Sequence, residues 1–452
     1  MAPLPPLPDD PSEPLDCVCF TLIIDDIVLP DGRTVMAQLG GSGAQSLFAF
    51  QLVNGQRTRV GLAAGVGPDL PSSCQAWLES IGVDLSGLVR YKRPTPRAWQ
   101  VFEADGRRTQ IYRVAGDPCD SLYEMLRPKF DVLPRRFREA RNYHIGVHPL
   151  HPPLRALAAM RAAAHAAGGV LSVEPYTAAE VRPSEEQLAQ LLGCCDIFSP
   201  NELEAKSLLG PGPPEQLLQR LFEAAGDDGA HTIVLRRGEH GVLAACRARS
   251  SADGGVGVGP AGVQQPRKEN EAGLLGAVDA SRAQEIQPSA TSFPLPVLHA
   301  WRVPAVADTK VADVTGCGNA FCGAFLAAYD RFRRLPASGE LLEAALWGCV
   351  AAAFMAEAEG VPTARVLDLQ VPALRRVEAL RPRAEKVELQ LPPPRPRPGQ
   401  GPGGDRAVVR VHARMRAAAA AGATAAATVT SGRLGRVRCT RSMPSVRGLA
   451  PA

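Results

Sequence analysis

Short apolar runs alternate with helical patterns along most of the chain, and this alternation constrains the fold more than any other feature. Strands that alternate with helices predict βαβ units and a mostly parallel sheet covered on both faces. We therefore expect an α/β three-layer sandwich with a mostly parallel central sheet. The expected strands are 17–24, 59–66, 142–147, 169–174, 195–200, 231–238 and 241–246, and the expected helices are 70–81, 154–166, 184–192, 202–209 and 215–225.

One segment, residues 97–114, breaks the alternation. Two strand-like runs meet there at Asp105-Gly106, a dipeptide that favours a tight hairpin turn. An antiparallel hairpin inside a parallel α/β protein has to lie apart from the main sheet, as an edge or as a flap over a site. We expect it to form a small antiparallel β lid.

Three stretches lack either period, and we expect them to be disordered. They are the proline-rich residues 1–14, an insertion at about 249–291 that is rich in Gly, Ala, Ser and Gln, and the low-complexity residues 391–452. Removing them leaves one domain over residues 15–388. The 43 Gly and 41 Pro of the chain are explained largely by the insertion and the tail.

The positive charge belongs to the tail. Residues 391–452 hold 11 Arg, one Asp and neither Lys nor Glu, a balance of 11 − 1 = +10, whereas the whole chain has a net charge of +4. The rest of the chain is therefore acidic, at 4 − 10 = −6. Arg-rich segments contact nucleic-acid phosphates, but this one has no interleaved aromatic residues for base stacking. The tail is thus a weak candidate for nucleic-acid binding, and the remainder of the chain is none.

The sequence predicts a cytoplasmic protein without a membrane partner. No window holds 18 consecutive apolar residues, and the first 14 residues are proline-rich and acidic, unlike a secretory signal. The 11 cysteines are odd in number and include no C-x-x-C pair, which favours reduced thiols.

The chemistry concentrates in residues 311–329, VADVTGCGNAFCGAFLAAY. The small-residue turn Thr315-Gly316-Cys317-Gly318 precedes a helical pattern that starts at Asn319. Converging backbone N–H groups at a helix N-terminus form a candidate anion cradle. The alternative is a tight turn before a buried helix. The spacing fits neither a Walker A loop nor a Rossmann fingerprint.

The run from Asp313 to Asn319, followed by Phe321 and Gly323, resembles the C-terminal signature D-T-x-G-A-G-D-x-F-x-G of the PfkB/ribokinase family. The resemblance implies a ribokinase-like fold. It also implies transfer of the γ-phosphoryl group of ATP to a hydroxyl of a small sugar, polyol or nucleoside.

Earlier motifs fall in the order of that family. Asp25, in the run I-I-D, is similar to the acidic residue that binds substrate hydroxyls, although a strand-end carboxylate facing solvent is the alternative. Gly40, Gly41 and Gln45 resemble the Gly-Gly substrate motif, with Gln45 or Ser46 where many relatives carry Asn. Asp25, Gly40, Gly41 and Gln45 are the expected substrate contacts.

The resemblance also implies a nucleotide side. Asn201 and Glu204 match the N-x-x-E motif, with Glu204 acting indirectly on Mg²⁺, although an Asn that caps a helix is the common alternative. Gly238 and Gly241 resemble the nucleotide-side glycine turn, and Thr315 completes the set. The cofactors implied are ATP and Mg²⁺, and the family allows a monovalent cation and a homodimer through the lid.

Asn319 departs from the family, because it stands where relatives carry the Asp that acts as general base. An amide cannot accept the proton, and loss of such a base costs on the order of 10²–10⁴ in rate. The amides of Gly316, Cys317 and Gly318 could still support catalysis by neutralising charge. The alternative function is a noncatalytic pseudokinase that acts as a nucleotide-binding or regulatory module.

Several features resemble a eukaryotic branch that includes the fungal maintenance-of-killer protein: I-I-D-D-I, G-V-G-P-D-L (65–70) and R-A-W-Q (97–100).

Two further candidate functional sites have weaker support in the sequence. Cys317 is a thiol inside the anion turn, where packing competes with a redox role. His144, His148 and His151 have ligand-like intervals, but the intervening prolines prevent them from sharing a helix face.

Overall fold

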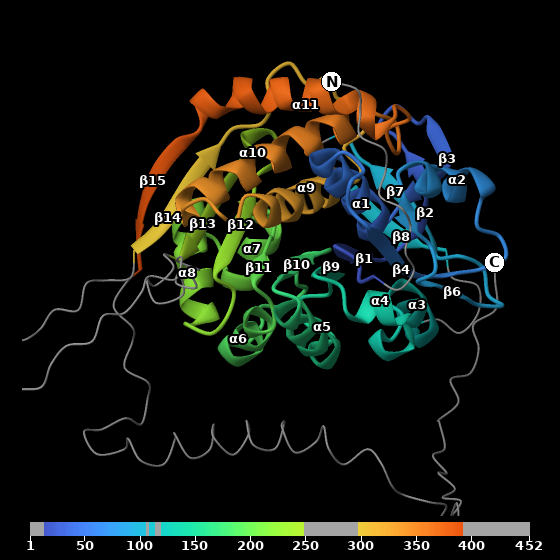
Figure 1. The fold of residues 1–452 in the computed structure, drawn as a ribbon, viewed down its shortest axis with the longest axis horizontal. Helices are drawn as coiled ribbons and strands as arrows, with labels where there is room; N and C mark the ends of the chain where they lie inside the picture. The colour runs from blue at the N-terminus through green and yellow to red at the C-terminus, as the bar shows by residue number, and fades with distance from the viewer. Residues whose placement is uncertain (1–12, 105–107, 114–118, 248–296, 392–452) are drawn as a thin grey trace, which may run out of the picture. The chain divides into compact units, whose positions relative to one another are not determined.

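A single large sheet forms the centre of the computed structural model (Figure 1), which describes residues 13–104, 108–113, 119–247 and 297–391. Its strands are parallel from β12 through β9 and β1 to β4, β5 and β6, whereas β12, β13, β14 and β15 pair antiparallel at one end. In spatial order the eleven strands are β15 (Glu385–Gln390), β14 (Val297–Val303), β13 (Val242–Arg247), β12 (Thr232–Arg236), β11 (Ile197–Phe198), β10 (Leu171–Pro175), β9 (Asn142–Val147), β1 (Cys17–Phe20), β4 (Val60–Val66) and β5 (Val83–Asp84), with β6 (Leu88–Arg90) also on β4.

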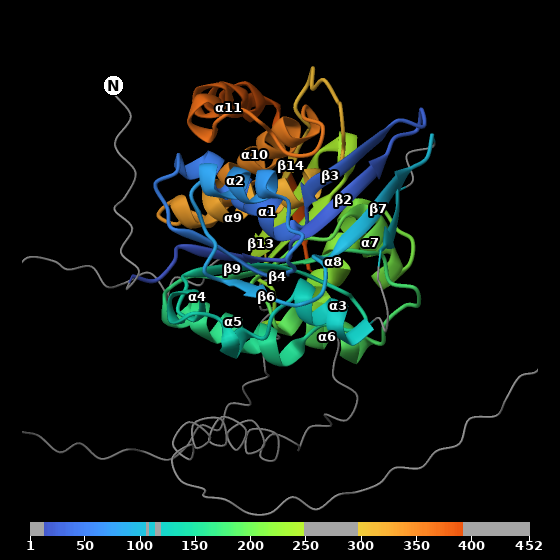
Figure 2. The ribbon, with the colours of Figure 1, turned by 90° about the vertical axis from the view of Figure 1, so that its right-hand side faces the viewer.

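Helices cover both faces of this sheet, which confirms the three-layer α/β sandwich (Figures 1 and 2). Alternate side chains of a strand point to opposite faces, so Cys17 and Cys19 pack into one core while Val18 and Phe20 pack into the other. The first core is closed by α1 (Ser42–Asn54), α2 (Ser72–Ser80), α9 (Cys317–Arg331), α10 (Ala337–Ala356) and α11 (Val366–Leu380). The second is closed by α4 (Arg135–Arg138), α5 (Leu154–Ala166), α6 (Glu185–Gly193), α7 (Glu202–Leu209) and α8 (Pro214–Ala225).

A second sheet of four strands lies apart from the first and forms the lid (Figure 2). The expected hairpin is present as β7 (Arg97–Phe102) and β8 (Arg108–Tyr112), but it is half of the lid and not the whole of it. The other half is β2 (Ile23–Val28) and β3 (Thr34–Gly40), and β2 pairs parallel with β7. Helix α3 (Cys119–Leu126) places Leu126 against Ile23 and Ala98 of this sheet. The turn at Asp105-Gly106 lies outside the described residues.

The strand expected over residues 17–24 is wrong, because the chain changes sheets in the middle of that run. β1 ends at Phe20 and β2 begins at Ile23. Between them Thr21 has a φ of 82°, a left-handed conformation that a strand does not continue through. Asp25 therefore belongs to the lid sheet and not to the end of a main-sheet strand.

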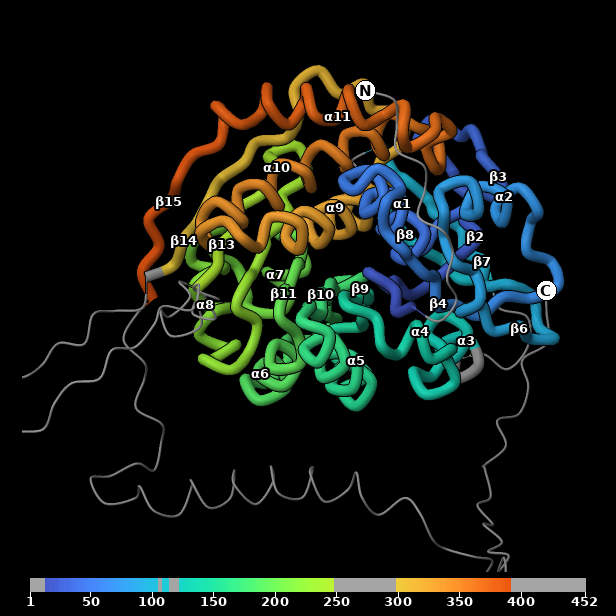
Figure 3. The backbone as a smooth tube through the Cα atoms, viewed as in Figure 1, coloured from blue at the N-terminus to red at the C-terminus, as the bar shows by residue number. Residues whose placement is uncertain are grey.

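Most of the remaining expected elements match the structure, whose backbone is traced in Figure 3, but the strand expected over residues 195–200 is present only as Ile197–Phe198. Helices α5 and α7 begin and end where the pattern predicts, and α9 begins two residues before Asn319. The sequence pattern did not single out α10, which is long and apolar enough to cross a membrane by length and composition. Its most apolar window has a mean hydropathy of 1.4, but 78% of that window is buried inside the protein, as in a core helix.

The close contact between α1 and α9 brings the two glycine-containing motifs together. A Cβ built on Gly323 of α9 would lie 2.0 Å from the backbone oxygen of Ser46 in α1, so the two helices touch backbone to backbone there. The chain divides into a unit of Met1–Pro393 and a unit of Pro394–Ala452. The insertion at 249–291, residues 1–12 and residues 392–452 of the tail lie outside the described residues. Nine cysteines have described side chains, and all nine are free thiols.

Candidate active site

The turn before α9 is built to receive an anion. Gly316 is the N-cap of the helix and has a φ of 82°, a left-handed conformation that favours glycine. Among the described residues no side chain caps this end, so the first amide N–H groups of α9 have no intrahelical acceptor. The Thr315 hydroxyl is buried and has no hydrogen-bond partner within the described part of the chain. The local geometry therefore fits the predicted anion cradle.

Asp313 shapes this turn and is not placed as a proton acceptor. One carboxylate oxygen accepts from the Thr315 N–H at 2.8 Å and the other accepts from the Gly360 N–H at 3.2 Å. Asp313 is buried, and both of its oxygens are used to hold backbone.

Gln45 and Asn319 meet across the α1–α9 contact. The Asn319 Nδ2 donates to Gln45 Oε1 at 2.6 Å, and the Ser46 hydroxyl donates to the Asn319 backbone oxygen at 2.8 Å. A Cβ on Gly316 would lie 2.2 Å from the Gln45 side chain, so glycine is required there for close approach as well. The predicted substrate motif and the predicted signature thus come together. Both side chains at this contact, Gln45 and Asn319, are uncharged amides.

Asp25 lies at the lid side of this region. Its Oδ1 accepts from Gln100 Nε2 at 2.8 Å, and its Oδ2 fills the space that a Cβ on Gly40 would need, 1.8 Å away. Burial raises the pKa of Asp25 to about 7, against the lowering effects of the Gln100 hydrogen bond and of Arg108 on β8. The carboxyl is 3% exposed and is therefore not a solvent-facing strand end.

The neighbouring Asp26 anchors the lid. Its carboxylate accepts from Arg97 and Arg113 at 2.6 Å each and from the Ala37 N–H at 2.9 Å. Burial alone would raise the pKa of Asp26, but these hydrogen bonds lower it to about 2. The pKa values of the adjacent Asp25 and Asp26 are therefore shifted in opposite directions, and the role of Asp26 in holding the lid was not expected from the sequence.

Asn201 and Glu204 form a capping box at the start of α7. Asn201 Oδ1 accepts from the Glu204 N–H at 2.8 Å, and Glu204 Oε2 accepts from the Asn201 N–H at 2.7 Å. The helix-cap interpretation of these residues is therefore correct as local structure. Burial raises the pKa of Glu204 to about 7, although Arg236 lowers it.

A buried charged cluster behind α9 is absent from the sequence expectations. Glu174 of β10 contacts three partners: His144 Nε2 at 3.2 Å, Cys322 Sγ at 3.4 Å and an Arg236 nitrogen at 3.0 Å. Arg236 also reaches Glu204 Oε2 at 3.4 Å. His144, Glu174 and Cys322 are of metal-ligating types and lie close together. However, they already satisfy one another, and Arg236 supplies a positive charge where a metal ion would have to lie.

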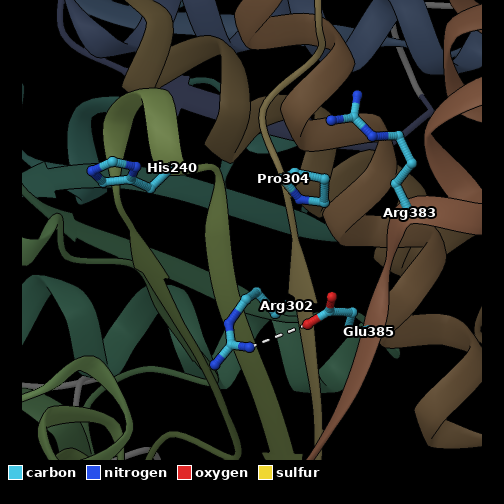
Figure 4. Close-up of a pocket in the computed structure, with 5 residues that line it drawn as sticks. All are labelled: His240, Arg302, Pro304, Arg383 and Glu385. Carbon is cyan, nitrogen blue, oxygen red and sulfur yellow. Dashed lines mark hydrogen bonds and ion pairs between the residues drawn. The ribbon is translucent and has the colours of Figure 1, made fainter.

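The remaining predicted residues lie at the edge of the site. Gly238 and Gly241 flank a 3₁₀ turn after β12, and a Cβ on Gly241 would come within 2.1 Å of the Val303 backbone oxygen at the end of β14. A pocket of about 360 Å³ opens beside this turn and is lined by His240, Arg302, Pro304, Arg383 and Glu385 (Figure 4). The pocket lies beside the glycine turn that is expected to contact the nucleotide, and its lining does not include Asp25, Gln45 or Asn319.

The match to known families decides what this assembly of motifs is. Residues 14–263, more than half of the chain, match the pfkB family carbohydrate kinases. The chain belongs to this family. The match covers the lid, the Gly-Gly motif and the N-x-x-E motif, whereas the anion turn lies beyond it.

Two curated proteins are similar to this pfkB family member over most of their length. An uncharacterised protein of Schizosaccharomyces pombe is 27% identical over 374 residues, which are 78% of this chain and 88% of the relative. The cytidine kinase of Thermococcus kodakarensis is 24% identical over 319 residues, which are 69% of this chain and 87% of the relative. The fungal relative is consistent with the eukaryotic branch that the sequence motifs resemble.

Solved structures support the fold. A crystal structure from Escherichia coli assigned as a ribokinase II, in complex with ATP and Mg²⁺, has a TM-score of 0.51 and 17% identity, covering 80% of this chain and 98% of that one. At this identity the likeness concerns the ribokinase-like fold alone.

The thiol of Cys317 does not suit a redox role in this pfkB family member. Burial raises its pKa to about 12, with a further contribution from Asp313. The thiolate is the reactive form of cysteine, so a thiol this weakly acidic is inert at neutral pH. The geometry favours the packing role for Cys317.

Proposed function

We propose that the chain is an ATP-dependent kinase that transfers the γ-phosphoryl group to a hydroxyl of a small sugar or nucleoside-like substrate. Membership of the pfkB family supports a kinase of this general type. The observation that carries the finer proposal is the uncapped N-terminus of α9, which meets Gln45 through Asn319. A ready anion site thus lies next to the substrate motif.

In this proposal the site has two sides. Asp25, Gly40, Gly41 and Gln45 contact the acceptor substrate, and Asn319 orients its hydroxyl. Phosphate groups lie at the amides of Gly316, Cys317 and Gly318. Bound ATP supplies the phosphoryl group, and Mg²⁺ neutralises its charge. The nucleotide-side residues are Thr315, Asn201, Glu204, Gly238 and Gly241.

The residues fit these groups chemically. The Thr315 hydroxyl, which has no hydrogen-bond partner among the described residues, and the N-terminus of α9, which no side chain caps there, suit phosphate oxygens; the Cys317 N–H also donates to the Val314 oxygen at 3.4 Å. Glu204 is engaged by the Asn201 N–H and by Arg236, so a role on Mg²⁺ through water suits it better than direct ligation.

Asp25 is the carboxyl best suited to accept the proton that Asn319 cannot take. It lies on the acceptor side, next to Gly40. Its pKa of about 7 is close to the value at which a general base works best at neutral pH.

The second candidate function is a noncatalytic pseudokinase, and the Asn319–Gln45 contact favours it. In that contact the Asn319 amide donates to Gln45, and an amide in place of the family carboxylate removes the expected base. Nucleotide binding would then serve a regulatory role.

A transfer assay separates the two functions. Full-length wild type, Asn319→Asp and Asn319→Ala are assayed with γ-labelled ATP against a panel of sugars and nucleosides. We expect measurable transfer by wild type and a gain on the order of 10²-fold for Asn319→Asp, because a carboxylate restores the base. The Gln45 amide can rotate to donate to it. Asn319→Ala controls for loss of the Gln45 contact.

Turnover by wild type would remove the pseudokinase hypothesis. Transfer by Asn319→Asp with none by wild type, at equal ATP affinity, would remove the enzyme hypothesis.

A further inference from the structure

The guanidinium of Arg236 lies against the first turn of α9. A Cβ built on Gly318, the second residue of that helix, would come within 2.2 Å of Arg236 Nη1. A side chain at position 318 would therefore displace the guanidinium. Gly318 leaves room for a cation beside the amides that the anion site uses.

Backbone contacts fix where Arg236 begins. It is the last residue of β12, its N–H donates to the Pro200 oxygen at 2.9 Å, and it forms a parallel bridge with Asn201. The side chain consequently starts beside the N-x-x-E motif and extends to α9. Its position follows from the parallel sheet and not from a mobile loop.

Two buried carboxylates hold the guanidinium in place. Nη1 lies 3.0 Å from Glu174 Oε2, and Nη2 lies 3.4 Å from Glu204 Oε2. The side chain of Arg236 is 12% exposed, and its Nε is buried without a hydrogen-bond partner in the part of the chain that the structure describes. The group therefore keeps an unused donor after both ion pairs are made.

This placement is electrostatically unfavourable unless negative charge offsets it. A helix N-terminus carries partial positive charge, so a cation beside it is repelled. Glu174 and Glu204 offset that repulsion in the unliganded protein. Once an anion arrives, the helix amides and the guanidinium attract it together, and a charge-assisted hydrogen bond is stronger than a neutral one.

We propose that Arg236 is part of the phosphate-binding site at the first turn of α9. This inference rests on the proposed function, because it concerns the same site. The ligand class is a pyrophosphate or the terminal phosphates of a nucleotide.

Pyrophosphate binding tests the role of Arg236 without depending on transfer activity. The full-length variants are Glu174→Gln and the double variant Arg236→Met/Glu174→Gln. Replacing Glu174 together with Arg236 removes the closer of the two carboxylates paired with the guanidinium, so that less uncompensated buried charge is left than after Arg236→Met alone. Pyrophosphate affinity is measured by isothermal titration calorimetry, and folding is checked by circular dichroism. We expect the double variant to bind about 10- to 100-fold more weakly than Glu174→Gln.

Arg161→Met is the matched control. Arg161 of α5 is also a mostly buried arginine, paired with Asp196 at 2.9 Å, and it makes no contact with α9 in the described contacts. Its substitution should leave pyrophosphate affinity at the wild-type value. Adding Arg236→Lys to Glu174→Gln should recover part of the lost affinity, because the charge returns without the planar guanidinium.

Equal pyrophosphate affinity in the single and double variants would overturn the inference, as would a wild type that binds no pyrophosphate. Arg236-dependent binding in a wild type without transfer activity would sustain the inference while the proposed function fails. If the double variant does not fold, Gly318→Ala gives the same test, because its Cβ displaces Nη1 while all charges remain. Unchanged affinity in that variant would also overturn the inference.

Discussion

At the residue scale, Asp25 combines deep burial with an ionisable group and a single hydrogen-bonding side chain. Its pKa of about 7 lies above the ordinary 3.8 because burial disfavours the charged form. The neutral form is therefore favoured in the fold below pH 7, and the carboxylate, which is the form that can accept a proton, is favoured above it. The stability that this group contributes is fully present below pH 4 and is lost as pH rises through 7.

Asp25→Asn should therefore stabilise the protein at pH 8 but much less at pH 4.5. An amide keeps the acceptor for Gln100 and removes the buried charge, and a pKa shift of this size corresponds to at most about 4 kcal/mol. Urea unfolding at both pH values measures the free energy of unfolding. The same variant should lose phosphoryl transfer by on the order of 10²-fold, because the candidate base is gone.

Gln100→Ala serves as the control, since it removes the hydrogen bond and leaves the carboxyl. If Asp25→Asn changes the free energy of unfolding equally at pH 4.5 and at pH 8, Asp25 is ionised in the fold at both pH values and the prediction is wrong.

A site residue could be predicted from the sequence only where it lies within a recognisable motif. Asp25, Gln45 and Asn319 stand in motifs, and the structure brings Gln45 and Asn319 into contact. Arg236 stands in none, since its importance comes from Gly318, 82 residues later in the chain. A charged residue at the carboxyl end of a buried parallel strand was the available signal.

At the element scale, the packing of α1 on α9 sets the relation between the Gly-Gly motif and the anion turn. Gly323→Ala should destabilise the protein by about 1–3 kcal/mol, because the new methyl group would meet the Ser46 backbone at 2.0 Å and force the helices apart. Chemical denaturation measures the loss. Gly323→Ala should also reduce transfer by moving Asn319 away from Gln45.

Gly339→Ala in α10 is the matched helix control. The nearest atom to its Cβ is 3.6 Å away, an ordinary contact, so the substitution should stabilise the helix by about 0.5–1 kcal/mol. A Gly323→Ala variant as stable as this control would contradict the close contact between α1 and α9.

Elements were predictable where one periodicity extended over the whole segment. Helices α5 and α7 are of this kind. The run Cys17–Ile24 was not, because its apolar composition is continuous while the chain changes sheets at Thr21. The lid was half predicted for a related reason: the hairpin β7–β8 has a local turn signal, whereas the pairing of β2 with β7 joins segments about 70 residues apart.

At the scale of the whole molecule, the last described strand closes one edge of the main sheet. β15 pairs with β14 along its full length and brings Leu389 into the core. A chain that ends at Pro393 should therefore keep the stability and the transfer rate of the full protein. A chain that ends at Ala384 should lose about 3–6 kcal/mol, because an edge strand and its buried leucines are removed.

Thermal and urea unfolding of both truncations measure this difference. The chain ending at Pro393 also lacks the +10 balance of the tail, so its retention on a nucleic-acid column should fall. Equal stability of the two truncations would show that β15 is dispensable. Equal retention of the full chain and the chain ending at Pro393 would exclude the tail as a nucleic-acid contact.

The change of sheets at Thr21 has a mechanical consequence. Asp25 is part of the lid sheet, whereas Arg236 is part of the main sheet and lies beside the N-terminus of α9. The connection is short, since four residues lie between the end of β1 at Phe20 and Asp25. If the proposed function holds, a rotation of the lid sheet about Thr21 would change the separation between the Asp25 carboxyl and the N-terminus of α9, so the lid would set the distance between acceptor and phosphate as well as cover the substrate.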